Sequence, residues 1–270
     1  MSDMLIVARK EFSDLLNSRL VLIVLAFYMF VLLQTFYHMY TNTITTPKGL
    51  ILMEPGFDAC YLGSLVAVVL GFSAMSEETS GKALNTLLVK PLYRDTIING
   101  KILGCVAFLS WIFWITVAIY TLAINLIAGS LISPYMALYV ERLPFVFLLY
   151  LLITMLFFSL SMLMSILFKE QSFALFMGFL VWIVFIFLLH DISIMQNLVV
   201  SLNLVLGGQY FSMYDPFSPI SMIRSMLVVD NYENIGALIS MEMPKIVKLA
   251  FYCFVSMALA YVAFLRKDVE

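Results

Sequence analysis

The stretch from Ile102 to Ile132 contains no charged residue and is apolar almost throughout. A helix of this length reaches about 46 Å, whereas the hydrocarbon core of a bilayer is about 30 Å thick. The stretch therefore predicts a membrane-spanning helix that is tilted or begins as an interfacial elbow. The rest of the chain agrees, because 63% of its residues are hydrophobic and only 12% are charged. A soluble domain with this composition would expose too much apolar surface, so we expect an integral membrane protein.

Five further runs are long and apolar enough to cross a bilayer. The six predicted spans are Leu20–Tyr40, Phe57–Met75, Ile102–Ile132, Leu143–Phe168, Ser172–Leu189 and Ile246–Leu265. The expected fold is an all-α, polytopic membrane protein with a single transmembrane domain over residues 1–270 and six transmembrane helices. We expect the spans to bury no charged side chain, which favours a hydrophobic or lipid-like substrate, or the passage of conformational work, over the transport of an ion.

An even number of spans places both chain ends on the same side of the membrane. Of the fifteen Lys and Arg residues, ten fall on that side: Arg9, Lys10, Arg19, Lys82, Lys90, Arg94, Lys101, Lys169, Arg266 and Lys267. Because positive charge is enriched in cytoplasmic loops, both termini are predicted to be cytoplasmic. The expected location is the plasma membrane.

Residues 1–19 precede the first span and alternate charged with apolar residues. Leu5, Ala8, Phe12 and Leu15 or Leu16 form a stripe at helical spacing, opposite Asp3, Lys10 and Asp14. Acidic residues in this region do not suit a cleaved signal peptide. We expect a retained helix that lies in the membrane interface.

Residues 76–101 form a polar segment between the second and third spans. Leu84, Leu87 and Leu88 share one face at helical spacing, with Thr79 or Ser80 as a possible N-cap and Pro91 at the end. We expect a short cytoplasmic helix, parallel to the membrane, that presents these leucines to a protein partner. The alternative is that the leucines rest against lipid headgroups as an anchor.

Residues 191–245 are too polar to span the membrane but contain apolar stretches. Pro216 and Pro219 prevent a continuous helix there, and Gly207-Gly208 indicates a turn. We expect an extracytoplasmic cap over the outer ends of the spans.

Residues with catalytic or metal-binding chemistry are sparse. His38 and His190 are predicted near the outer membrane boundary, where an imidazole is tolerated without a chemical role. No Gly-rich phosphate loop with a lysine is present, so the chain is not expected to hydrolyse nucleotide or to be an enzyme. The near-zero net charge without a basic block gives no basis for binding nucleic acid.

Eighteen methionines raise the alternative of a copper site, because thioether sulfur is a soft ligand. Met162 and Met164, like Met241 and Met243, have the M-x-M spacing. On a helix these positions point to different faces, and methionine commonly fills gaps in apolar packing. We expect no metal site.

Three sequence segments together resemble the type-2 permease family of ABC transporters. They are Ala8-Arg9-Lys10-Glu11-Phe12, then Ser76-Glu77-Glu78-x-x-Gly81-x-x-Leu84-x-x-Leu87-Leu88-x-x-Pro91, and Asn99-Gly100-Lys101. The resemblance covers the whole chain in span count and order. A narrower resemblance is to the permease subunit of the nitrous oxide reductase maturation transporter. It rests on Asp215-Pro216-Phe217-Ser218-Pro219 and Arg224.

This resemblance implies a permease subunit of an ATP-driven ABC transporter, and an exporter. It implies two separate ABC ATPase subunits, which bind ATP and Mg, and a second permease copy or a paralogue; this chain itself needs no cofactor. The polar segment would be the coupling helix. The residues carried over as ATPase contacts are Glu77, Glu78, Gly81, Leu84, Leu87, Leu88 and Pro91, with Arg9, Lys10, Glu11 and Phe12 in the interfacial helix and Asp215, Pro216, Pro219 and Arg224 in the cap.

Two other functions stay open. A stand-alone secondary transporter or channel would need polar residues or broken helices at matching places in two halves, and only Gln34 and Asn125 come close. An intramembrane peptidase could use paired acids such as Glu77 and Glu78. Prenyl-protein proteases, however, carry an arginine where this chain has Lys82, and both histidines here are predicted at the opposite face.

Overall fold

The structure is a computed structural model that describes residues 3–41, 54–79, 94–168, 170–185, 203–208 and 235–266, together with residues 197, 200 and 201. Within these ranges the chain is helical and contains no strand. The main helices are α1 (Asp3–Asn17), α2 (Arg19–Thr41), α4 (Glu54–Thr79), α6 (Arg94–Ile132), α7 (Met136–Leu167), α8 (Gln171–Ile183) and α11 (Ile235–Arg266), with a short 3-10 helix, η1 (Ser133–Tyr135), before α7. The expected all-α polytopic fold is confirmed.

Five of the described helices are long and apolar enough to cross a membrane. Their apolar parts are Arg19–Tyr37, Asp58–Met75, Thr96–Ile127, Ser133–Leu167 and Ile239–Arg266. The shorter apolar helix α8 coincides with the start of the predicted fifth span, whose last part, residues 186–189, lies outside the described residues. The third predicted span lies within α6, which is one continuous helix of 39 residues and so about 58 Å long. The chain therefore does not form an interfacial elbow in this span.

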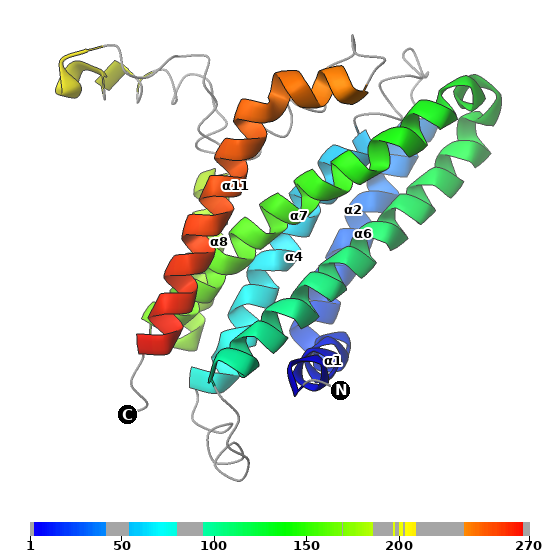
Figure 1. The fold of residues 1–270 in the computed structure, drawn as a ribbon. Coiled ribbons are helices and arrows are strands. Elements are labelled where there is room, and N and C mark those ends of the chain that lie inside the picture. Colours follow the sequence, from blue (N-terminus) through cyan, green and yellow to red (C-terminus); the bar gives the residue numbers. More distant parts are fainter. Residues whose placement is uncertain are drawn as a thin grey trace.

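The long helices lie alongside one another, and α1 lies crosswise at one end of the bundle (Figure 1). The end of α4, the start of α6 and the end of α11 lie at the same end as α1. A break at Ser18 separates α1 from α2, and the Ser18 carbonyl accepts the first hydrogen bond of α2 from Leu22 N at 2.9 Å. The first described helix, α1, and the end of the last, α11, thus lie at the same end of the bundle, which agrees with the predicted even number of spans. The cytoplasmic location of that end stays a prediction.

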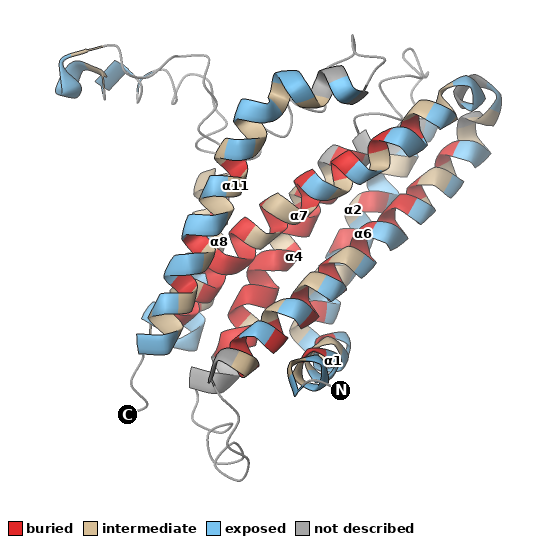
Figure 2. Ribbon diagram, in the orientation of Figure 1, coloured by how far each residue is buried: buried red, intermediate tan, exposed pale blue. Residues whose placement is uncertain are grey.

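The most buried part of the molecule is the contact between α4 and α7 (Figure 2). The two backbones approach so closely at Gly71 that an added Cβ would lie 2.2 Å from the Phe158 carbonyl oxygen. A second close contact between α4 and α7 involves a side chain, since a Cβ at Gly63 would lie 2.3 Å from the Tyr150 ring. Small residues permit such close packing between membrane helices. These glycines therefore fix how α4 lies against α7.

Neutral hydroxyl groups join the same helices. Ser161 Oγ on α7 donates to the Val68 carbonyl oxygen on α4 at 2.6 Å. Trp182 Nε1 on α8 donates to Ser64 Oγ on α4 at 2.9 Å. Ser159 Oγ on α7 lies 2.6 Å from Ser256 Oγ on α11. Hydrogen bonds of neutral side chains thus join α4, α7, α8 and α11 at these points.

The helices α2 and α11 are attached by narrow stripes. The buried residues of α11 include Leu249, Ser256 and Ala260, which recur at helical spacing. Large apolar side chains on the outer faces, such as Phe30 on α2 and Phe254 on α11, are mostly exposed. In an integral membrane protein such faces suit contact with lipid or with another membrane helix.

The predicted turn at Gly207-Gly208 is confirmed. Gly207 has a positive φ of 69°, and Gly208 N donates to the Asn203 carbonyl oxygen at 3.1 Å. This is the hydrogen bond of a glycine-terminated helix end. The predicted cap ends earlier than expected, because residues 235–245 form the first part of α11 and not a separate segment. Residues 209–234 lie outside the described residues.

Candidate functional site

The polar segment between the second and third spans is shorter than predicted, because helices extend into it from both sides. α4 continues to Thr79 and α6 begins at Arg94, which leaves residues 80–93 between them. The sequence boundaries followed the ends of apolar runs, whereas a helix continues as long as its backbone hydrogen bonds do. Glu77 and Glu78 therefore lie in the last turn of α4.

Most of the predicted contact residues fall outside the part of the chain that the structure describes. For the coupling helix these are Gly81, Leu84, Leu87, Leu88 and Pro91. For the cap they are Asp215, Pro216, Pro219 and Arg224. Their proposed roles stay predictions. The described site is the group of helix ends that surrounds residues 80–93, namely α1, the end of α4 and the start of α6.

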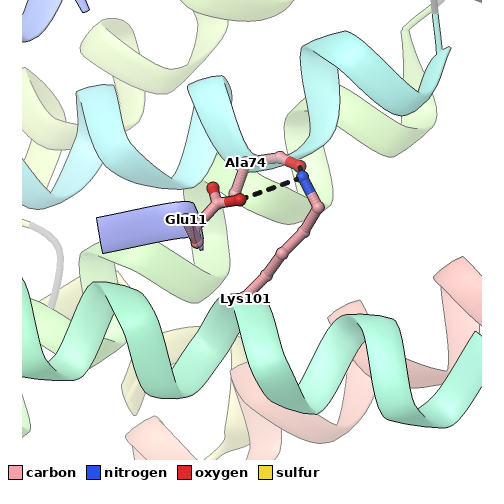
Figure 3. A network of polar contacts seen from close by, with 3 residues as sticks. All are labelled: Glu11, Ala74 and Lys101. Atoms are coloured by element: carbon pink, nitrogen blue, oxygen red, sulfur yellow. Dashed lines mark hydrogen bonds and ion pairs between the residues drawn. The ribbon is translucent and has the colours of Figure 1, made fainter. Parts of the chain in front are cut away.

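A buried lysine joins these three helices (Figure 3). Lys101 Nζ on α6 donates a hydrogen bond to the Ala74 carbonyl oxygen on α4 at 2.9 Å. The same nitrogen lies 3.4 Å from Glu11 Oε2 on α1. The side chains of Lys101 and Glu11 are only 7% and 12% exposed. An ion pair with so little solvent access is screened weakly, so its attraction is stronger than that of a surface pair.

The burial of Lys101 corrects the expectation that the spans bury no charged residue. Lys101 lies in the apolar part of α6, and Arg142, in the apolar part of α7, is also buried. Sequence analysis placed Lys101 in the cytoplasmic segment, because a hydropathy pattern treats each charge as if it were exposed. A buried charge is tolerated when it is paired and hydrogen-bonded, and only the fold reveals the partners.

Two glycines on α6 form the surface on which α1 lies. A Cβ at Gly100 would lie 2.7 Å from Val7 Cβ, and a Cβ at Gly104 would lie 2.8 Å from the Ala8 carbonyl oxygen. Because the glycines are four residues apart, they share one face of α6. This G-x-x-x-G spacing commonly lets two membrane helices approach closely. In this protein the helix that packs against Gly100 and Gly104 is the short helix α1 and not another span.

The predicted interfacial residues divide between the two faces of α1. Arg9 and Lys10 are exposed, whereas Glu11 is directed toward Lys101. The Phe12 ring packs edge-on against Phe108 and Trp111 of α6, with centroid distances of 5.7 and 6.4 Å.

The stripe predicted to face lipid is partly covered by protein, since Ala8 and Leu15 are buried. Leu5, also in that stripe, is exposed. α1 is therefore fixed to α6 along its length and contacts α2 much less.

Gly100 and Lys101 belong to the segments that carry the family resemblance, but no contact or role was predicted for them or for Gly104. The G-x-x-x-G spacing was a visible signal for a close helix contact, but it did not identify α1 as the partner. No signal connected Glu11 with Lys101, because the two residues are far apart in the chain. Among the described residues, no group of three or more His, Cys, Asp or Glu side chains is placed to hold a metal ion. The contacts of Lys101 hold the three helices together.

One comparison with known proteins identifies the family. The model of the ABC-2 family transporter protein matches residues 5–269, which is nearly the whole chain. No curated protein matches the chain.

Proposed function

Because this chain belongs to the ABC-2 transporter family and is a membrane permease subunit of an ABC transporter, we propose that it couples ATP hydrolysis by separate subunits to export of a substrate. The complex would contain two ABC ATPase subunits, each with ATP and Mg, and two permease copies or one copy and a paralogue. Residues 80–93 would form the contact with the ATPase. The outward direction and the subunit count rest on the family resemblance.

The observation that supports this proposal most strongly is the anchoring of residues 80–93 at both ends. The segment follows α4 and precedes α6, and Lys101 of α6 is bonded to the Ala74 carbonyl of α4. A force on the segment would therefore act on a joined pair of helices. Since α4 is interlocked with α7 at Gly71, the displacement would pass into the centre of the bundle.

ATP binding would close the two ATPase subunits on each other and move the coupling segment as a rigid body. The helices α4 and α6 would follow, and the interface between the two permease subunits would change to let the substrate pass. This chain supplies no nucleotide site in this scheme. Its part is to bind the ATPase through Leu84, Leu87 and Leu88 and to convert motion outside the membrane into motion inside it.

The test is the variant Leu88→Asp. A leucine that inserts into a groove on the ATPase contributes about 1.5–3 kcal/mol of burial, and an unpaired buried charge adds a cost of roughly 2 kcal/mol. Since 1.4 kcal/mol is about tenfold in affinity, a micromolar complex is expected to dissociate. We expect the ATPase to be lost from the tagged chain purified from its native membrane, while membrane insertion stays normal.

The matched control is Thr86→Asp. It adds the same charge to the same predicted helix, but on the face opposite the leucines. The ATPase is expected to remain bound to this variant. If Leu88→Asp also keeps the ATPase, the leucines anchor the segment to lipid instead. If no ATPase purifies with the unaltered chain, a stand-alone transporter becomes the better explanation.

A further inference from the structure

The Glu11–Lys101 pair is expensive to bury, and simpler packing would hold α1 in place. Taking two charges out of water has a desolvation cost that their attraction only partly offsets. Apolar residues of similar volume often stabilise a fold equally well or better. The position of α1 is already defined by Gly100, Gly104 and the Phe12 ring. The ion pair is therefore not needed to hold α1 against α6, and its location points to a role in the movement of these helices.

The pair lies at the base of the coupling segment. Ala74 is little more than one turn before the end of α4, and Lys101 is about two turns after the start of α6. One ammonium group contacts both α4 and α1 at this level. Short, stiff lengths of helix thus connect the coupling segment to the point where the three helices meet.

We propose that Lys101 is a positioning residue that makes α1 move together with α4 and α6 when nucleotide drives the coupling segment. The inference rests on the function proposed above and deepens it, because it assigns α1 a role in transmission. The packing on Gly100, Gly104 and Phe12 sets where α1 rests. The charged contact is directional, and it keeps α1 in that position when α6 moves. Without the charged contact, α6 moves and α1 lags behind.

The experiment uses the complex of permease and ATPase purified from the native membrane and placed in lipid nanodiscs. Spin labels are attached at exposed positions in two pairs, Ser13 with Glu141 and Asn99 with Glu141. Glu141 on α7 is the reference, Ser13 reports α1 and Asn99 reports α6. Cys60 and Cys105 are buried, and a Cys253→Ser background removes the remaining, partly buried thiol. Double electron–electron resonance measures the distance between the two labels of each pair. The distances are compared between the complex without nucleotide and the complex with nucleotide trapped by vanadate.

In the native chain, trapping is expected to shift both label pairs together. The decisive variant is Glu11→Gln with Lys101→Met, which removes both charges and leaves no unpaired ion. We expect the Asn99 shift to remain and the Ser13 shift to be lost. The separate variant Lys101→Arg keeps both the cation and Glu11, so the Ser13 shift is expected to remain in it. If the ion pair served only in folding, its removal would affect the Ser13 and Asn99 shifts alike.

The control is Asp14→Asn, which neutralises an exposed carboxylate one turn from Glu11 on the same helix. Both label pairs are expected to shift in it as in the native chain. If the double variant does not fold, Glu11→Gln alone, which keeps Lys101 on Ala74, is expected to lose the Ser13 shift.

Retention of both shifts in the charge-removing variants overturns the inference, as does a native complex in which the labels do not shift together. Failure of the ATPase to purify with the native chain would instead reject the proposed function.

Discussion

Two helix contacts in this molecule depend on glycine but differ in their polar groups. In the contact of α4 with α7, Gly71 brings the backbones together and Ser161 adds a neutral hydrogen bond to Val68. In the contact of α1 with α6, Gly104 allows the close approach and Lys101 pairs with Glu11. The first contact joins two spans, and the second joins a span to a helix that crosses the end of the bundle (Figure 1).

The difference follows from what confines each helix. The bilayer already holds α4 and α7 upright, so shape and a few hydroxyl groups suffice to set their relative position. The helix α1 does not span the bilayer. Its place on α6 is set by the packing at Gly100 and Gly104, and the directional contact of Glu11 with Lys101 is added to that packing. The contact at the centre of the bundle is therefore neutral, and the charged contact lies at the end of the bundle where α4 ends and α6 begins.

The largest effect is expected for Gly71→Ala. The added Cβ would lie 2.2 Å from the Phe158 carbonyl oxygen. This clash is with the backbone, so a change of side-chain rotamer cannot relieve it. We expect the free energy of unfolding in detergent to fall by about 3 kcal/mol, at the upper end of the usual overpacking range. The control is Gly129→Ala, because no atom lies within 4 Å of the new Cβ. It should be neutral or gain up to about 1 kcal/mol from helix propensity. Equal losses in both variants would mean that Gly71 does not mark a close contact.

A smaller and more local effect is expected for Gly104→Ala. Its Cβ would lie 2.8 Å from the Ala8 carbonyl and 2.9 Å from Glu11 Cβ. α1 can shift away from α6 without opening the bundle, so the cost is expected to be about 1–2 kcal/mol. Hydrogen exchange should become faster in the backbone amides of α1 and stay unchanged in α4 and α7. Faster exchange throughout the bundle would contradict the separation of the two contacts.

The smallest effect is expected for Ser161→Ala, which removes the hydrogen bond to the Val68 carbonyl. Such bonds between membrane helices contribute about 0.6–1 kcal/mol, so the loss should be near that value in reversible unfolding. Ser110→Ala is the matched control, because the Ser110 hydroxyl bonds the Val106 carbonyl of its own helix at 2.7 Å. A comparable loss in the control would show that the hydroxyl between α4 and α7 has no special part.

The apolar runs of the sequence determined the helical fold, and the family resemblance agreed with the family match. Hydropathy is a property of consecutive residues, so it identifies a span such as α6 without knowledge of its neighbours. The ends of helices were less predictable. α4 and α6 extend past their apolar runs into the predicted coupling segment, because polar residues at the membrane boundary also form helical hydrogen bonds.

Only the tertiary structure decided what surrounds the coupling segment. The sequence marked Lys101 as one of several cytoplasmic charges and Glu11 as part of an interfacial helix. The fold brings the two within 3.4 Å, because Gly100 and Gly104 let α1 lie directly on α6. Whether a charge is buried and paired depends on how helices from distant parts of the chain cross. The residue pattern of one segment carries no information about how that segment crosses another. The contact between α1, α4 and α6 is therefore decided by the tertiary structure.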